Sequence, residues 1–170
     1  LYGIDGRASE EIAELDARMG AGAALDITAN PITTQSLMPK AMWVRDHEPD
    51  VWERTHLLLD APGYLAFKLT GRFGADLFTS CAGGLIDIHR LERSQAVFEA
   101  AGVPIEKFAE PVWPATVVGG VSAEAAKICG LAQGTPVIAG TVDAAVECLG
   151  AGMTEDGEVC LTYGTTAVVL

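Results

Sequence analysis

The residues best suited to chemistry are an aspartate and a glycine–threonine turn near the end of the chain. Asp143 follows an apolar run at 136–139 and a glycine, and it opens a stretch of small residues typical of a helix. In open α/β folds ligands collect at the carboxyl ends of strands, so a carboxylate here would face a cleft and could accept a proton. An aspartate at a helix start also caps free backbone N–H groups, and the local pattern alone favours this structural role.

The second segment is the turn Gly164-Thr165-Thr166, which lies between β-branched runs at 158–162 and 166–170. The two runs predict a hairpin. Backbone N–H groups and threonine hydroxyls in such a turn can donate hydrogen bonds to phosphate oxygens, and glycine permits a close approach. An ordinary hairpin turn explains the same residues, so neither segment is specific in isolation.

Taken together, the two segments resemble the FGGY family of carbohydrate kinases. The order of strand, aspartate, small-residue helix and Gly-Thr-Thr hairpin is similar to the junction of that family's two domains. Segments upstream are also similar to family motifs, so the resemblance covers essentially the whole chain, with xylulose kinases the most similar members. The residues that carry it are Tyr2-Gly-Ile-Asp5-Gly-Arg7, Met38-Pro39-Lys40-Ala-Met-Trp43, Asp60-Ala-Pro-Gly-Tyr64, Ala139-Gly-Thr-Val-Asp143 and Thr162-Tyr-Gly164-Thr165-Thr166.

The resemblance implies ATP-dependent transfer of a phosphoryl group to a sugar hydroxyl. Asp143 would be the base that accepts the hydroxyl proton. Gly164, Thr165 and Thr166 would bind the phosphates of ATP, with Mg²⁺ bridging the nucleotide and no metal ligand from this chain. The alternative from another class is a non-catalytic member of the actin-like superfamily, which binds a sugar or nucleotide without phosphoryl transfer.

Sugar contacts implied by the resemblance fall on Tyr2, Asp5 and Gln35. Tyr2 stands where many family members have tryptophan, and Ala144 stands where pentulose kinases commonly carry an amide. These departures leave the identity of the sugar open. The resemblance to xylulose kinases implies a pentulose such as xylulose, with gluconate or a polyol as alternatives. Trp43, by its residue type, favours core packing.

The family's fold implies an α/β structure, the actin-like (ribonuclease H-like) ATPase domain of a two-domain sugar kinase. Residues 1–152 would form the C-terminal part of the first, sugar-binding domain, and residues 153–170 would open the second, ATP-binding domain. Glycines on both sides of residue 153 favour a boundary there. Because the chain starts without methionine and stops within an apolar run, we expect it to be a piece of a longer protein.

Helix caps and glycines predict the elements that position these residues. In the first hundred residues they indicate five helices, and from residue 116 β-branched runs alternate with helices, which is α/β organisation. Within 73–88, the apolar run at 85–88 is the better strand candidate. The expected helices are 9–19, 36–47, one opening at the capping-box pattern 50–53, 60–71, 94–101, 122–129 and 143–149; the expected strands also include 116–121 and 136–139.

Composition excludes several classes of partner. A net charge of −12 without a Lys/Arg cluster disfavours nucleic acid and anionic membranes, whereas a nucleotide can still be held by backbone N–H groups and a metal ion. The four cysteines and three histidines show no zinc-ligand spacing. No apolar run reaches the ~20 residues that span a bilayer. We expect a cytoplasmic protein with reduced thiols, and a homodimer is compatible with these features.

Overall fold

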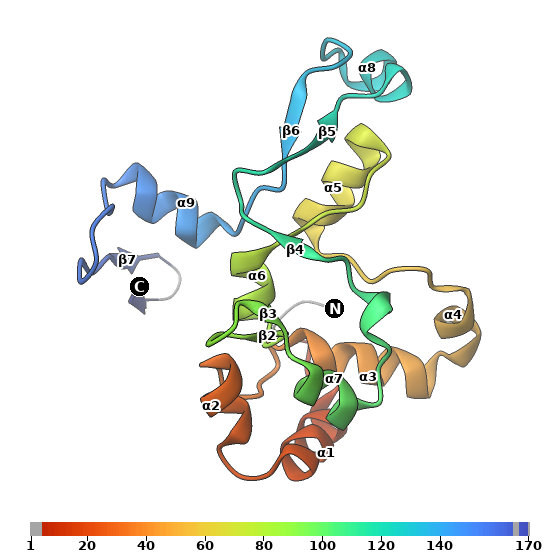
Figure 1. Ribbon diagram of the computed structural model, residues 1–170, viewed down its shortest axis with the longest axis vertical. Helices are drawn as coiled ribbons and strands as arrows, with labels where there is room; N and C mark the ends of the chain where they lie inside the picture. The colour runs from red at the N-terminus through yellow and green to blue at the C-terminus, as the bar shows by residue number, and fades with distance from the viewer. Residues whose placement is uncertain (1–4, 165–166, 170) are drawn as a thin grey trace. The chain divides into compact units, whose positions relative to one another are not determined.

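The computed structural model describes residues 5–164 and 167–169 of the chain. Contacts between Cα atoms divide the chain into two compact units, Leu1–Gly140 and Thr141–Leu170. The predicted domain boundary after residue 152 refers to the two domains of a longer protein, and it stays a prediction. Figure 1 labels the helices and strands.

Short helices dominate the first unit, with short strands between them. The helices are α1 (Ser9–Met19), α2 (Ala23–Thr28), α3 (Leu37–His47), α4 (Pro49–Arg54), α5 (Ala61–Thr70), α6 (Leu77–Ala82), α7 (Gln95–Ala101) and α8 (Ala123–Cys129), and a 3-10 turn spans Ile105–Lys107. The strands are β1 (Ala75–Asp76), β2 (Ile86–Asp87), β3 (Glu92–Arg93), β4 (Pro111–Val112), β5 (Val117–Gly120) and β6 (Pro136–Ile138).

The strands of the first unit pair two by two within the described residues. β1 runs parallel to β4, whereas β2 pairs with β3 and β5 with β6 in antiparallel register. α5 packs beside the β5–β6 pair and also contacts α8 (Figure 1). Gly119 permits this packing, because a Cβ atom there would lie 3.0 Å from the Cβ of Thr70 in α5.

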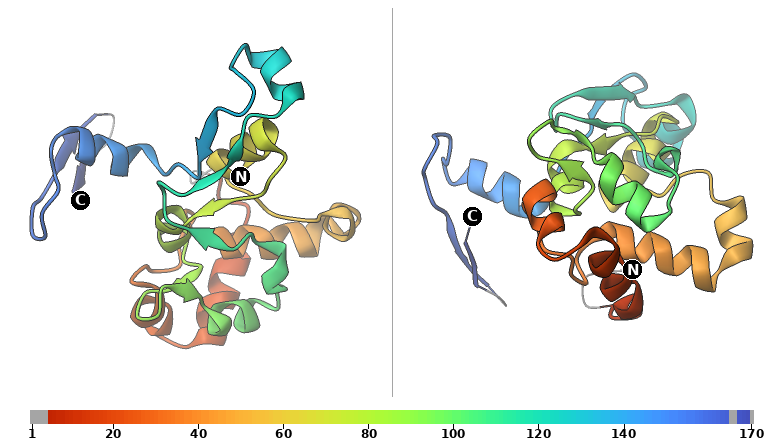
Figure 2. Two further views of the ribbon diagram at one scale, coloured as in Figure 1. Left: turned by 45° about the horizontal axis from the view of Figure 1, so that its top comes forward. Right: turned by 60° about the horizontal axis from the view of Figure 1, so that its bottom comes forward.

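The core of the first unit forms where α1, α3 and α7 pack side by side (Figure 2). Apolar residues recur at helical spacing in these elements, so each helix turns one apolar stripe inward. Phe98 of α7 and Phe108 meet edge to face with ring centroids 5.6 Å apart. The buried cluster also contains Leu15, Met38, Ala41, Met42, Leu77, Leu85, Ile86, Val97, Ala101 and Val103.

Several predicted helix caps are confirmed. Asp60 caps α5 by accepting a hydrogen bond from the N–H of Gly63 at 2.7 Å, and Gly71 ends that helix with φ of 74°. Ser94 and Ser122 cap α7 and α8 in the same way. These helices begin and end as predicted because the cap interactions are local.

The predicted helix 9–19 has the bounds of α1, but the start of α4 and the presence of α6 differ from expectation. The N-cap of α1 is Ala8, so Ser9 is already helical. α4 begins at Pro49 and not at Asp50, because the fixed φ of proline suits the first helical position. The stretch 73–88 contains α6, which follows Asp76; the Asp76 carboxylate caps it by accepting from the N–H of Thr79 at 3.0 Å.

The second unit contains α9 (Asp143–Gly150) and a hairpin of β7 (Leu161–Tyr163) and β8 (Ala167–Val169). The hairpin is as predicted, but its first strand is shorter than 158–162. Glu158 lies in a turn, where its carboxylate accepts hydrogen bonds from the N–H groups of Thr154 and Glu155 at 2.7 and 3.0 Å. Within the described ranges, none of the helices combines the length and apolarity of a membrane span.

Candidate functional site

The predicted site residues are distributed over both units. Asp5 and Gln35 lie in the first unit, and Asp143 lies in the second, as does Gly164. Tyr2, Thr165 and Thr166 are outside the described residues. Gln35 is exposed in the segment before α3, where its N–H donates to the hydroxyl of Thr33 at 3.1 Å.

Asp143 is the first helical residue of α9. Val142, in extended conformation, occupies the N-cap position and makes no side-chain cap. The exposed carboxylate of Asp143 accepts a hydrogen bond from the N–H of Ala144 at 2.8 Å, and its charge interacts favourably with the helix dipole. The aspartate is therefore not at the N-cap position that the capping interpretation requires, and its carboxylate is accessible.

The turn that brings the chain from β6 towards α9 depends on a glycine. Gly140 has φ of 77°, a left-handed conformation that is strained for other residues. Its N–H donates to the carbonyl of Pro114 at 3.1 Å, and the N–H of Ala139 donates to that of Thr116 at 3.0 Å. This glycine turn at a strand end is the local structure that the sequence predicted before Asp143.

Gly164, the first residue of the predicted phosphate loop, directly follows strand β7. Tyr163 pairs with Ala167 at this end of the hairpin, and Thr165 and Thr166 lie outside the described residues. Gly164 is exposed. A short connection with a glycine at its first position lets backbone N–H groups approach an anion closely.

Asp5 is held by Arg7. The Nη2 of Arg7 lies 2.6 Å from Asp5 Oδ2, its Nε lies 3.0 and 3.1 Å from the two carboxylate oxygens, and its backbone N–H donates to Oδ1 at 3.1 Å. These hydrogen bonds from Arg7 lower the pKa of the Asp5 carboxyl from 3.8 to about 2. Asp5 is thus a fixed anion near the start of the described chain.

The Asp5–Arg7 pair gives a prediction for pH. A depressed pKa means that the pair stabilises the folded protein above the ordinary pKa of 3.8, and that this contribution is lost as the pH falls through about 2. Arg7→Gln removes the cation, so the pKa of Asp5 should rise towards 3.8. Carboxyl-carbon NMR of aspartate-labelled full-length protein measures this shift. An unchanged Asp5 titration in the variant would show that Arg7 does not hold the carboxylate.

A cavity of about 210 Å³ lies in the first unit, with mostly apolar walls. Its polar groups include Lys40 and Asp60. Burial lowers the pKa of the Lys40 ammonium, and the nearby carboxylate of Asp5 opposes that effect. Burial raises the pKa of Asp60, whose carboxylate already caps α5. Ser80 and Arg93 also line the cavity, whereas Asp5 and Gln35 do not.

Metal-binding groups are not clustered in the part of the chain that the structure describes. No three or more His, Cys, Asp or Glu side chains there lie together as a protein metal site requires. The sequence placed Arg7 and Trp43 in motifs of the resembling family, but it predicted neither the contact between them nor the stacking of His47 on Trp43. The spacing of Trp43 and His47 by four residues on one helix was a usable signal, since such residues are neighbours on a helix surface.

Comparisons with known proteins agree on one family. Residues 3–150 match the FGGY family of carbohydrate kinases, N-terminal domain. The chain is 30% identical over 164 residues to the autoinducer-2 kinase of Yersinia enterocolitica, covering 95% of this chain and 31% of that protein. The xylulose kinase from Rhodospirillum rubrum superposes with a TM-score of 0.91 at 32% identity, over 97% of this chain and 34% of that one.

A gluconate kinase from Lactobacillus acidophilus shares the fold, with a TM-score of 0.89 at 19% identity over 99% of this chain and 34% of that one. The chain thus spans about a third of the length of the relatives it matches. These neighbours confirm the predicted fold class, α/β of the actin-like ATPase type. On these matches the chain belongs to the FGGY family of carbohydrate kinases.

Proposed function

We propose that the full-length protein containing this chain transfers the γ-phosphoryl group of ATP to a sugar hydroxyl. Family membership supports the reaction class. The observation that carries the proposal is the position of Asp143, whose accessible carboxylate stands at the first residue of α9 while Val142 occupies the cap position. The carboxylate accepts one backbone hydrogen bond, from the N–H of Ala144, and its exposure leaves it accessible to a substrate hydroxyl.

In the proposed reaction, different residues of this chain carry out proton transfer and phosphate binding. Asp143 accepts the proton of the sugar hydroxyl as that oxygen attacks phosphorus. Gly164, Thr165 and Thr166 donate hydrogen bonds to phosphate oxygens, and the exposed glycine at the start of their loop fits this role. Bound ATP would supply the phosphoryl group, and Mg²⁺ would neutralise phosphate charge. In this proposal residues 1–152 belong to the first domain and residues 153–170 to the second.

The proposed substrate is a pentulose such as xylulose. The likeness to the xylulose kinase from Rhodospirillum rubrum supports this choice. Tyr2, Asp5 and Gln35 would contact the sugar, with Asp5 as a fixed anion that accepts hydrogen bonds from hydroxyls. Ala144 has no side-chain amide with which to bind a pentulose hydroxyl, so gluconate and polyols are alternative substrates. The likeness to an autoinducer-2 kinase adds autoinducer-2 to the candidates.

The alternative function is binding of a sugar or nucleotide without phosphoryl transfer. The presence of both Asp143 and the Gly164-Thr165-Thr166 loop favours the kinase, because a binding protein has no use for a base beside a phosphate loop.

Both functions are tested by one assay of the full-length protein with ATP and Mg²⁺. ADP release is measured with xylulose, other ketoses, polyols, gluconate and autoinducer-2, and the products are identified by mass. We expect sugar-dependent ADP release with one class of acceptor and a matching phosphorylated product. Calorimetric binding of a sugar without ADP release would establish the non-catalytic alternative. ADP release at the same rate with and without every acceptor would contradict both proposed functions.

A further inference from the structure

The guanidinium of Arg7 connects the Asp5 segment to α3. On one side it forms the ion pair with Asp5, at 2.6 Å. On the other side its Cζ lies 4.5 Å from the centroid of the Trp43 ring. A cation over an aromatic face is attracted by the ring quadrupole, and a planar guanidinium can also stack on it. Arg7 is therefore held between a carboxylate and an indole.

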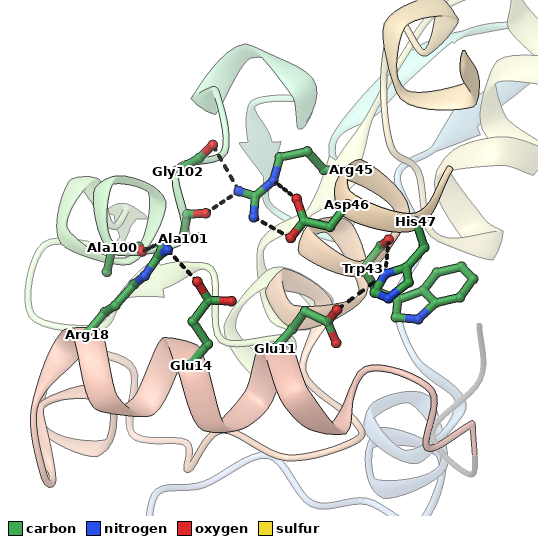
Figure 3. A network of polar contacts seen from close by, with 10 residues as sticks. All are labelled: Glu11, Glu14, Arg18, Trp43, Arg45, Asp46, His47, Ala100, Ala101 and Gly102. Atoms are coloured by element: carbon green, nitrogen blue, oxygen red, sulfur yellow. Dashed lines mark hydrogen bonds and ion pairs between the residues drawn. The ribbon is translucent and has the colours of Figure 1, made fainter. Parts of the chain in front are cut away.

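Trp43 is itself fixed in place. Its ring stacks on that of His47, one turn later in α3, with centroids 4.9 Å apart and planes 11° from parallel. His47 Nδ1 lies 3.1 Å from the carbonyl oxygen of Trp43 and 3.4 Å from Oε1 of Glu11 in α1 (Figure 3). The Glu11 side chain is only 5% exposed. The expectation that Trp43 packs in the core is wrong, because it lies half-buried at the edge of α3, between Arg7 and His47.

The helices that carry these side chains are tied together by further polar contacts (Figure 3). Arg45 of α3 pairs with Asp46 at 2.6 Å and donates to the carbonyl oxygen of Gly102 at 3.2 Å, after the end of α7. Arg18 of α1 donates to the carbonyl oxygen of Ala100 in α7 at 3.0 Å, and it also pairs with Glu14. Trp43 and His47, called the platform below, lie on α3. The contacts above link α3 to both α1 and α7.

Lys40 of α3 is a second cation that acts on Asp5, in addition to Arg7. It precedes Trp43 by three residues, so the two side chains are neighbours on the surface of α3. The carboxylate of Asp5 lies within electrostatic range of the Lys40 ammonium. α3 therefore acts on Asp5 in two ways. Lys40 acts through its charge, and Trp43 acts through its contact with Arg7.

We propose that Trp43 and His47 are positioning residues for sugar binding: they hold Arg7, and through it the carboxylate of Asp5, in the segment that contacts the sugar. This inference rests on the proposed function. It concerns sugar binding and not the chemical step, because Trp43 and His47 would act through Arg7 on Asp5, whereas the proposed base and phosphate loop are other residues. Loss of the platform should weaken sugar binding and leave turnover and nucleotide affinity in place.

The test compares Trp43→Leu with Trp43→Phe in the full-length protein. Leucine removes the aromatic face, whereas phenylalanine keeps one. The matched control is Trp52→Leu, which removes another half-buried indole of the first unit with a cation over its ring, the Nζ of Lys107 at 5.0 Å. We expect Trp43→Leu to raise KM for the sugar about 3- to 30-fold, the range expected for a lost cation–π contact, with kcat and KM for ATP unchanged. Trp43→Phe should restore most of the sugar KM, and Trp52→Leu should leave it at the parent value.

Amide hydrogen exchange gives a second readout that needs no substrate. The backbone N–H of Arg7 donates to Asp5 at 3.1 Å, so its exchange reports whether the segment is held. Exchange there should accelerate in Trp43→Leu and not in Trp52→Leu. Unchanged exchange would overturn the proposal, and so would accelerated exchange with an unchanged sugar KM. If the parent enzyme shows no sugar-dependent turnover, the proposed function is contradicted. Amide exchange at Arg7 would still show whether Trp43 holds the segment of Asp5 and Arg7 in place.

Discussion

Asp143→Asn in the full-length protein should lower sugar-dependent turnover by roughly 10²–10⁴, the usual contribution of a positioned base. The amide has nearly the shape of the carboxylate but cannot accept the hydroxyl proton. Sugar affinity should be preserved. The thermal midpoint should change little, because Val142 occupies the cap position and the variant loses only a favourable charge near the helix dipole. Steady-state kinetics, calorimetric sugar binding and a thermal melt measure the three quantities.

Glu147→Gln is the matched control for this variant. Glu147 is an exposed carboxylate one turn further along α9, so the same chemical change is made on the same helix. Its turnover should equal that of the parent. An Asp143→Asn enzyme with more than about a tenth of the parent turnover would lie outside the range for a lost base and would return Asp143 to a structural role.

The sequence predicts best those elements that are determined by neighbouring residues. α5 is an example, because Asp60 caps its first turn and Gly71 adopts the left-handed conformation at its end. The stretch 73–88 shows the limit of this approach. Its short apolar runs are compatible with either helix or strand, and the cap at Asp76 was the only local signal for α6.

Long-range contacts could not be predicted from local pattern. The parallel pairing of β1 with β4 joins residues 75–76 to residues 111–112, and nothing within either pair of residues specifies the partner. The same holds for Arg7 and Trp43, whose contact depends on how α1 packs against α3. The chemistry of a motif can therefore be predicted from sequence where its residues are adjacent, whereas the side chains that hold it in place emerge only from packing.

For Asp143 the sequence left two interpretations open, and the structure bears on one of them. A capping aspartate must precede the first helical residue, and Asp143 is that residue. The pattern favours Asp143 over Val142 as the cap, because aspartate is a good N-cap residue and valine a poor one, yet the helix begins one residue earlier than that preference implies. At the first helical position the Asp143 carboxylate still accepts a hydrogen bond from the N–H of Ala144, so its role as a base stays a prediction.

Thr165→Val should weaken the interaction with ATP by about 1.5–3 kcal/mol, because it removes one hydroxyl that donates to a charged phosphate oxygen. That is roughly a 10- to 150-fold loss in kcat/KM for ATP, with sugar binding nearly unchanged. Valine has nearly the shape of threonine, so the effect isolates the hydrogen bond. Thr165→Ser keeps the hydroxyl and should retain most of the activity.

Thr162→Val is the matched control, because Thr162 belongs to strand β7 of the same hairpin, where it pairs with Val168. A β-branched replacement is equally suited to that strand, so the hairpin should form in both valine variants. ATP kinetics should be those of the parent in Thr162→Val and impaired only in Thr165→Val. Equal ATP kinetics in both variants would mean that the Gly164-Thr165-Thr166 segment is a turn without contact to phosphate. Equal losses in both would indicate that the hairpin as a whole, and no single hydroxyl, determines nucleotide binding.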